Sequence, residues 1–399
     1  MSESNPTFVG FFGTLLTCIM PRTMSGGRSA ECIRHEIVRL CHSGLDSRTF
    51  RVEAVKRLRK AIPVDVSFFA TADPATLLFT SAVVDDVVAR STSQFLENEF
   101  LRDDSVKFAR LARGRSPVGS LGVATKGELN LSPRYQEILA PMDLGDELRG
   151  ALVVGSKCWG FMCLHRERSS PNFTSAEATF LAKLTPHLAE GLRTALLIGD
   201  GRVTSLPPEG PGLVLLGDDL SLAAITPAAE GWLAEVAKSD WPGSLELPGA
   251  VYAVAAQLLA LERGGHTPPD LMPRTRLRTA SGRWVVLHAS RLRAADTEGR
   301  IAIIFEEARP SEIAPLIVDA YGLTKREGEI TQLVLRGLST AEVSEELHIT
   351  SNTVRDHFKA IFDKVGVRSR RELGGQIFAQ QYHPRMATGR EPDADGWFT

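Results

Sequence analysis

The stretch SNTVRDHFKAIFDKVGVRSR, residues 351–370, decides how the C-terminal part of the chain folds. Its apolar residues share the spacing of one helical face: Val354, Phe358, Ile361, Phe362 and Val365. At about 100° per residue, the opposite face holds Asn352, Arg355, Asp356 and Lys359. Arg and Lys outnumber Asp in this stretch, although the formal net charge of the 399-residue chain is only −2. The stretch therefore predicts an amphipathic helix with a locally basic outer face.

The residues around this helix contain three pairs with the S/T-x-x-E spacing of a capping box: Thr324 with Glu327, Ser339 with Glu342, and Ser369 with Glu372. With the apolar periodicity they predict four short helices, over 325–336, 340–347, 351–364 and 370–381. Only residues 348–350 separate the second helix from the third. Two short helices joined by a three-residue turn, the second with a basic face, indicate a helix-turn-helix.

A recognition helix lies in the major groove, so its outward residues must donate to or accept from base edges and phosphates. Arg355 and Lys359 suit guanine, Asp356 can accept from a cytosine amine, and Asn352 can read adenine or hold a phosphate. The candidate DNA-binding residues are Ser351, Asn352, Thr353, Arg355, Asp356, Lys359, Lys364, Arg368, Ser369 and Arg370. Those outside the outer face lie at the helix N-terminus or just beyond its end, where they can contact phosphates.

The segments LTKREGEI, GLSTAEVSEEL and SNTVRDHFKAIFDKVGVRSR resemble the LuxR-type (GerE or NarL type) helix-turn-helix. The usual pattern of that family is L-T-x-R-E, G-x-S-x-x-E-I-A, T-V-x-x-H, K-L and R-S-R. The resemblance implies that Arg355, Asp356 and Lys359 face bases. It also implies that Thr353, Lys364 and Arg368 face phosphates, and that Leu373 and Ile377 on the fourth helix contact a second copy. His348 stands where Gly is usual, Lys325 where Pro is common, and Asp356 is an unusual acidic choice.

The first two thirds of the chain predict two α+β regions. In the first, VSFFATADPATLLFTS predicts two strands around a turn, and residues 148–166 predict a hairpin through 155–157. Thr174 and Glu177 form a capping box at the start of a long closing helix. In the second, GLVLLGDDLSLAAIT predicts a strand, Thr226 and Pro227 start a helix through Leu233, and residues 274–308 predict a three-stranded meander.

The first region is similar to a GAF domain, through FLENEFLRDDSVKFARLARGRSPVGS, DLGDELRGALVVGSKCWGFMCLHRE and FTSAEATFLAKLTPHLAEGLR. The second resembles a PAS domain, through GLVLLGDDLSLAAITPAAEGWL and the strands that follow. We therefore expect a multidomain chain with an α+β GAF-like sensor, an α+β PAS-like sensor and an all-α four-helix LuxR-type helix-turn-helix.

The expected divisions are an N-terminal extension of uncertain status (1–28), the GAF-like domain (29–198), a linker (199–211), the PAS-like domain (212–308), a second linker (309–321), the helix-turn-helix domain (322–383) and a disordered tail (384–399). The apolar run FVGFFGTLLTCIM has no basic residue before it and is too short to span a bilayer. A signal peptide, an interfacial segment, a buried segment and a true start at Met24 are the alternatives, of which the last two are favoured.

Few residues suggest a metal or cofactor. Strand alternation would place Cys158 on the face opposite Cys163 and His165, so these three would not converge on a metal. His266 and His288 are candidate haem ligands, but a structural or exposed role is favoured for both. Trp159 and Trp232 are expected in the core rather than stacked on a ligand. We predict no cofactor, no metal and no catalytic residue.

Composition and motifs limit the function classes. The chain is 43% hydrophobic and 24% charged, and its five Cys show no paired spacing, which is typical of a reduced cytoplasmic protein. P-loop, nucleophile-elbow, HExxH and kinase motifs are missing from the sequence, so we expect no enzyme. The preferred interpretation is a cytoplasmic transcriptional regulator that acts as a dimer on an inverted repeat of duplex DNA. It would activate transcription through RNA polymerase, with repression as the alternative. It would respond to an unknown small-molecule effector and would not bind a membrane.

Three alternative classes of protein are less favoured. A quorum-type receptor for an acyl lactone shares the helix-turn-helix but usually has one ligand domain. A phosphorylated response regulator needs an acidic pair, for which VVDD at 83–86 is a candidate, but the alternating βα pattern is missing. A redox or gas sensor would need a cofactor.

Overall fold

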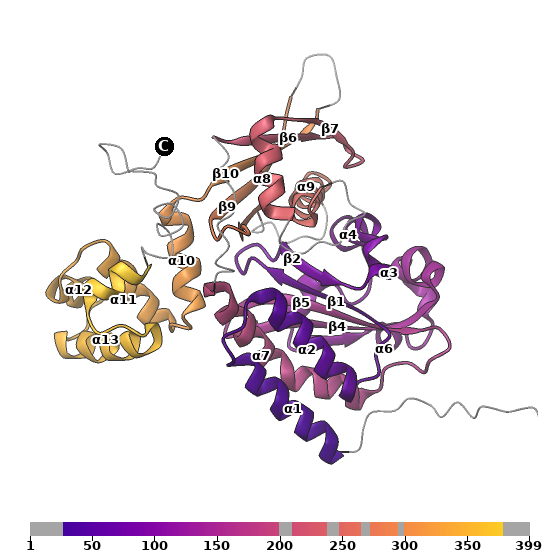
Figure 1. The fold of residues 1–399 in the computed structure, drawn as a ribbon, viewed down its shortest axis with the longest axis horizontal. Helices are drawn as coiled ribbons and strands as arrows, with labels where there is room; N and C mark the ends of the chain where they lie inside the picture. The colour runs from indigo at the N-terminus through magenta and orange to yellow at the C-terminus, as the bar shows by residue number, and fades with distance from the viewer. Residues whose placement is uncertain (1–26, 199–209, 238–246, 265–271, 294–298, 378–399) are drawn as a thin grey trace, which may run out of the picture.

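The computed structural model describes residues 27–198, 210–237, 247–264, 272–293 and 299–377. They form two sheet-containing α+β parts and a small helical C-terminal part (Figure 1). Among these residues, every helix is too short or too polar to cross a membrane. The expected N-terminal extension before residue 27, the first linker through residue 209, the tail after 377 and His266 lie outside the described residues.

The first part is built on a five-stranded antiparallel sheet in the order β2-β1-β5-β4-β3. Its strands are β1 (Val66–Ala72), β2 (Phe79–Val84), β3 (Val118–Ser120), β4 (Leu144–Val154) and β5 (Lys157–Glu167). Both predicted hairpins, β1–β2 and β4–β5, are confirmed. An all-antiparallel sheet does not fit the receiver domain of a response regulator. Asp85 of the VVDD stretch instead accepts hydrogen bonds from the Ser67 N–H and the Arg59 guanidinium.

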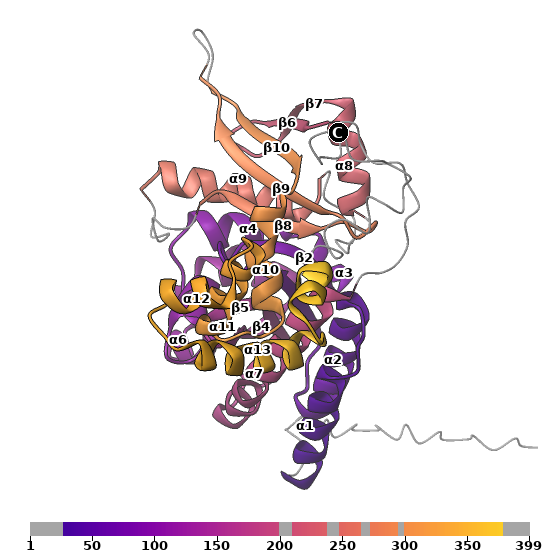
Figure 2. The ribbon, with the colours of Figure 1, turned by 90° about the vertical axis from the view of Figure 1, so that its left-hand side faces the viewer.

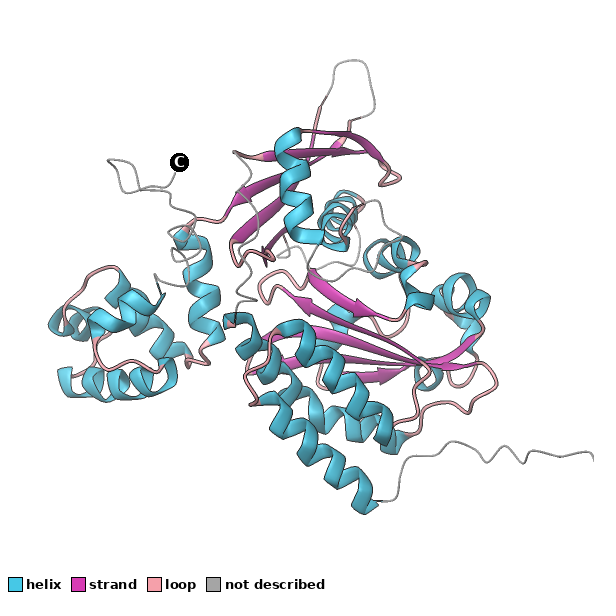
Figure 3. Ribbon diagram, viewed as in Figure 1, coloured by secondary structure: helices cyan, strands magenta, loops and turns pink. Residues whose placement is uncertain are grey.

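Helices cover both faces of this sheet (Figures 1 and 3). The long helices α1 (Gly27–Cys41), α2 (Ser47–Ala61) and α7 (Ser175–Leu197) pack on one face, with residues such as Met162 and Leu164. The predicted capping box of Thr174 and Glu177 begins α7. The opposite face carries α3 (Asp86–Ala89), α4 (Thr92–Leu101), α5 (Phe108–Arg113), α6 (Leu121–Ala124), the 3-10 turns Leu129–Leu131 and Ala140–Met142, and the π-helical turn Tyr135–Leu139.

The second part has a sheet with the same strand order, β7-β6-β10-β9-β8. Its elements are β6 (Gly212–Leu216), β7 (Leu222–Ile225), α8 (Pro227–Ala237), α9 (Gly249–Glu262), β8 (Arg274–Arg278), β9 (Trp284–Arg291) and β10 (Ile301–Glu307). The meander β8–β9–β10 is confirmed. The single strand expected over GLVLLGDDLSLAAIT is wrong, because the Asp219 carboxylate accepts from the Ser221 N–H at 3.0 Å and turns the chain into a hairpin.

Helix α9 joins the two sheet-containing parts and is not among the helices expected from the sequence. Nearly all of its residues are buried, because it has no polar face. It packs against α4 and β2 of the first part and against β9 of the second. The described residues of the two parts therefore share one apolar core.

A buried ion pair fixes the same contact. Arg276 on β8 donates from Nε and Nη2 to the Asp73 carboxylate at 2.9 and 2.7 Å, and its backbone N–H adds a third bond at 2.9 Å. Its Nη1 reaches the Glu312 carbonyl oxygen at 2.9 Å. The hydrogen bonds of Arg276 therefore link the first part, the second part and the helix that follows them.

That connecting helix, α10 (Pro310–Ala320), occupies most of the segment expected as the second linker. The Glu312 carboxylate accepts from the Arg309 N–H at 2.7 Å at its start. It packs on α7, and its Asp319 pairs with Lys157, the first residue of β5, at 3.3 Å.

The C-terminal part contains the predicted helices, α11 (Lys325–Leu335), α12 (Thr340–Glu346) and α13 (Ser351–Val365), followed by helical residues 370–377 (Figure 2). Its buried apolar side chains are Ile330, Leu333, Val334, Val343, Val354, Phe358, Ile361, Val365, Leu373 and Ile377. This core positions the outer face of α13.

We predict that Asp73→Ala lowers the free energy of unfolding by about 3 kcal/mol, because it leaves a mostly buried guanidinium without its carboxylate. Urea denaturation measures this loss. The control is Asp103→Ala, whose exposed pair with Arg110 should contribute less than about 1 kcal/mol. Equal losses in the two variants would contradict the assigned role of Asp73.

Candidate nucleic-acid interface

Side-chain caps fix the ends of the helices that hold α13. The capping boxes of Thr324 with Glu327 and of Ser339 with Glu342 are confirmed. The third differs from the expectation. The Ser369 hydroxyl accepts from the Glu372 N–H at 3.1 Å, but the Glu372 carboxylate accepts from the Arg368 N–H instead of the Ser369 N–H.

The turn between α12 and α13 is held from both sides. His348, at the position where the family usually has Gly, has a φ of 52° in the left-handed region that Gly tolerates best. Arg326 of α11 donates to the Leu347 carbonyl oxygen at 2.7 Å, and the Ile349 N–H donates to the Ser344 carbonyl oxygen at 3.0 Å. These bonds fix the angle at which α13 leaves the turn.

The division of α13 into two faces is as predicted. Val354, Phe358, Ile361 and Val365 are buried, and Asn352, Arg355, Asp356 and Lys359 are exposed. The exposed residues pair along the helix: Arg355 donates to the Asn352 side chain at 2.9 Å, and Lys359 lies 3.4 Å from Asp356. Such exposed pairs contribute little to stability, so these groups can exchange partners for bases at small cost.

The N-terminus of α13 depends on Thr350, which is not among the site residues expected from the sequence. Thr350 is the N-cap, and its hydroxyl accepts from the Thr353 N–H at 3.2 Å and lies 2.9 Å from the Thr353 hydroxyl. The signal was a Thr directly before the helix. Ser351 is half-buried, whereas Thr353 is exposed.

Three basic residues expected at phosphates differ in their surroundings. Arg368 is exposed. Lys364 pairs with Glu327 at 2.6 Å. Arg370 donates to the Leu338 carbonyl oxygen and lies over the Phe358 ring at 5.5 Å. Lys364 and Arg370 therefore also stabilise the domain.

The expected dimer contact at Leu373 and Ile377 needs correction. These side chains are 0% and 2% exposed because they pack into the core of their own domain. They are not available on the surface of the monomer. A second copy that approaches this helix would instead meet its exposed residues Arg371, Gly375 and Gln376.

Comparison with known proteins agrees with this geometry. The family model "Bacterial regulatory proteins, luxR family" (GerE) matches residues 322–374. The transcriptional regulatory protein DesR of Bacillus subtilis is 40% identical over 63 residues, which cover 16% of this chain and 32% of DesR. The spore germination protein GerE of the same species is 42% identical over 48 residues, which cover 12% of this chain and 65% of GerE. The C-terminal part is therefore a LuxR-type helix-turn-helix domain, and this chain spans less than two thirds of either relative.

Solved structures give only a weak likeness to this chain. The GAF domain from an Acinetobacter phosphoenolpyruvate-protein phosphotransferase is 17% identical and covers 43% of this chain and 96% of its own, with a TM-score of 0.28. VqmA of Vibrio cholerae is 16% identical and covers 44% and 84%, with a TM-score of 0.19. With TM-scores this low, the likeness assigns no family to the sheet-containing parts.

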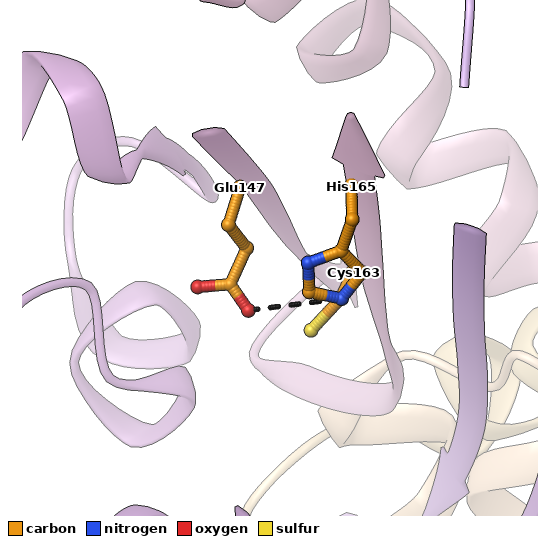
Figure 4. Close-up of side chains that lie close together, drawn as sticks. All are labelled: Glu147, Cys163 and His165. Atoms are coloured by element: carbon orange, nitrogen blue, oxygen red, sulfur yellow. Dashed lines mark ion pairs between the residues drawn. The ribbon is translucent and has the colours of Figure 1, made fainter. Parts of the chain in front are cut away.

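Inside the first part, Glu147, Cys163 and His165 form a buried cluster whose ligand-type atoms lie within 4.8 Å of one another (Figure 4). The predicted position of Cys158 is wrong, because a β-bulge at Trp159 returns Cys158 to the face of Cys163. Cys158 nevertheless lies outside the cluster, and Glu147 from the neighbouring strand takes the third place.

The surroundings of this cluster resemble a salt-bridged core more than a metal site. The Glu147 carboxylate lies 2.9 Å from Arg134 Nε and 3.0 Å from Arg149 Nε. Burial raises the pKa of the Cys163 thiol well above its usual value, which favours the protonated thiol. Burial lowers the pKa of His165 to about 4, an effect that Glu147 opposes and Arg149 reinforces. A metal ion would have to compete with both guanidinium groups for Glu147.

Two tryptophans and one histidine of the sheet-containing parts have structural surroundings. Trp159 and Trp232 are buried, as expected of core residues. The Trp232 Nε1–H donates to the Gly210 carbonyl oxygen at 3.1 Å. His288 on β9 is partly exposed and lies 3.9 Å from Glu306.

The lowered pKa of His165 predicts a pH dependence of stability. The unfolded chain binds a proton near the ordinary value of 6.5, and the folded chain only near 4. Stability from this group is complete above pH 6.5 and falls by roughly 3 kcal/mol as the pH drops to 4. Thermal unfolding of wild type and His165→Gln across this range measures it. The variant should show the smaller slope, whereas His35→Gln, at an exposed site, should match wild type. Identical slopes for wild type and His165→Gln would contradict the assignment.

Proposed function

We propose that the chain is a sequence-specific DNA-binding transcriptional regulator. The observation that carries the proposal is the outer face of α13 in a LuxR-type domain. There, Asn352, Arg355, Asp356 and Lys359 are exposed while the opposite face is buried. Arg355, Asp356 and Lys359 would contact base edges, and Ser351, Thr353 and Arg368 would contact phosphates, with Lys364, Ser369 and Arg370 at the edge of the contact.

We further propose a cytoplasmic dimer that binds an inverted repeat and activates transcription with RNA polymerase. The two sheet-containing parts would act as GAF-like and PAS-like sensors of a small effector. Their support is the sheet order that both parts share, the continuous core around α9, and the connecting helix that ties them to the DNA-binding domain. An effector would act by binding one arrangement of these parts more tightly than another.

Selection of bound duplexes from a random DNA pool tests the proposal, with the full chain and the 309–399 fragment in parallel. An inverted repeat enriched by both supports a dimeric DNA-binding function with the sheet-containing parts as modulators. Enrichment by the fragment alone would mean that those parts restrain it. If neither protein enriches any sequence, the DNA-binding function is refuted. If both sediment as monomers on DNA, the dimer is refuted.

Arg355→Ala should weaken binding to the selected site by about 1–3 kcal/mol and relax specificity at one base pair. The reason is that a bidentate contact to a guanine would be lost. Titration of labelled duplexes with single base changes measures both effects. Arg110→Ala on the first part is the control. Unchanged affinity and specificity would remove Arg355 from the base contacts.

Lys364→Ala should weaken binding to all sequences alike and reduce the dependence of affinity on salt by about one phosphate contact. Because Lys364 also pairs with Glu327, Glu327→Gln serves as the second variant. This substitution frees the Lys364 ammonium group, so the dependence of affinity on salt should stay the same or become steeper. Equal salt slopes for wild type and Lys364→Ala would refute the phosphate contact.

A further inference from the structure

The second sheet is covered by helices on its inner face, where Val214, Leu287 and Phe305 share a core with α9. Side chains alternate along a strand, so the neighbours of these residues point to the opposite, outer face. Figure 2 looks onto this outer face of β9 and β10, with α10 below it. The end of the outer face next to α10 is closed, because Trp284 and Val286 are buried in the same core as α10.

Away from α10, the outer face presents apolar side chains to water. The strand register brings them together, with Leu213 opposite Ile304, and Leu215 opposite Ala302 on one side and Ala224 on the other. Leu213, Leu215 and Ile304 are half-buried, and Ala224 is exposed. All of these residues lie outside the two apolar cores of the described residues. The sheet therefore has an apolar area that its own helices leave open.

The two ends of β10 carry opposite charges on this face. Glu306 is exposed near the end of the strand and lies 3.9 Å from His288. Arg300 directly precedes the strand and is exposed as well. Its carbonyl oxygen accepts from the Leu292 N–H at 2.8 Å, so the ladder of the sheet continues to this residue. Alternation therefore places Arg300 and Glu306 on the same side of the sheet as Ile304.

This spacing makes β10 complementary to a second copy of itself. Ile303 lies midway between Arg300 and Glu306. If two copies stack their outer faces about a two-fold axis that crosses the strands at Ile303, Arg300 of each copy lies opposite Glu306 of the other. Each dimer would then contain two oppositely charged pairs at the rim of an apolar contact, which is the usual arrangement of a protein interface.

The same axis also matches the apolar side chains. In the register of the sheet, it passes between Leu213 and Leu215 on β6. Leu213 of one copy would therefore lie opposite Leu215 of the other, and the large Ile304 would lie opposite the small Ala302. Large side chains that face small ones allow two sheets to interdigitate at a separation of about 10 Å.

We propose that the outer face of the second sheet binds a second copy of this chain, with β10 of the two copies antiparallel across a two-fold axis. This inference rests on the dimer of the proposed function and names its surface. It places the contact outside the DNA-binding domain, where Leu373 and Ile377 are buried. The axis would also relate the two DNA-binding domains, as an inverted repeat requires.

Sedimentation equilibrium of the full chain without DNA tests the surface. We expect a dimer for wild type, and self-association at least about tenfold weaker for Ile304→Thr, which keeps a β-branched side chain but puts a hydroxyl into the apolar contact. Val123→Thr is the matched control, because Val123 is an exposed valine of the first part. It should associate as wild type does.

Exchange of the charges is the sharper test. Arg300→Glu and Glu306→Arg should each weaken self-association about tenfold, because each dimer would then hold two pairs of like charge. An equimolar mixture of the two variants should associate as tightly as wild type, since each copy carries the charges that the other needs. The double variant Arg300→Glu/Glu306→Arg should also recover. A contact within one copy could not be restored by mixing.

A monomer at every concentration would overturn this surface and the proposed dimer together. A dimer that is equally strong in Ile304→Thr and both charge variants would overturn the surface alone, and so would charge variants that the mixture does not restore. A chain that dimerises only after removal of residues 1–26 would assign the face to the apolar run 8–20 of the same copy, which also overturns the proposal. Circular dichroism of each variant separates loss of the contact from loss of the fold. A chain that dimerises through this face but enriches no DNA would keep the surface and refute only the DNA-binding function.

Discussion

Burial of α9 is the constraint on which the arrangement of the sheet-containing parts depends. A helix with no polar face must be covered on all sides, and neither sheet alone can cover it. The first part supplies α4 and β2, and the second supplies β9. If the two parts separated, both would expose apolar surface to water, which is unfavourable. The Asp73–Arg276 pair lies beside this core. Its hydrogen bonds are directional, so they fix the relative position of the two parts, which hydrophobic burial alone would not.

The same order of strands supports different interiors in the two parts. In the first, phenylalanine rings fill one face of the sheet, with the Phe108 and Phe161 centroids 4.6 Å apart and Arg149 4.5 Å from the Phe108 centroid. Arg149 is balanced by Glu147 and Glu99, so the interior holds charge without an exposed partner. Protein side chains therefore fill this face of the sheet.

The DNA-binding domain shows how one residue can serve both fold and contact. Lys364 holds Glu327, which itself caps α11, and Arg370 holds the Leu338 carbonyl oxygen while it covers Phe358. A phosphate that binds Lys364 or Arg370 would compete with these contacts inside the domain and would lower its stability. Arg355 and Lys359 have only exposed partners on their own helix, so they are freer to exchange them.

The sequence by itself determined the features that depend on neighbours three or four residues apart. The approximate boundaries of α11 to α13, the capping boxes that begin α11 and α12, and the outer face of α13 follow from periodicity and from hydroxyl–carboxylate spacing, which act within one turn of helix. Only the tertiary structure decided the position of α9, the inward direction of Leu373 and Ile377, the bulge that reverses Cys158, and the meeting of Glu147 with His165. Each of these depends on which distant segment covers the residue or pairs with its strand, and no local pattern specifies that choice.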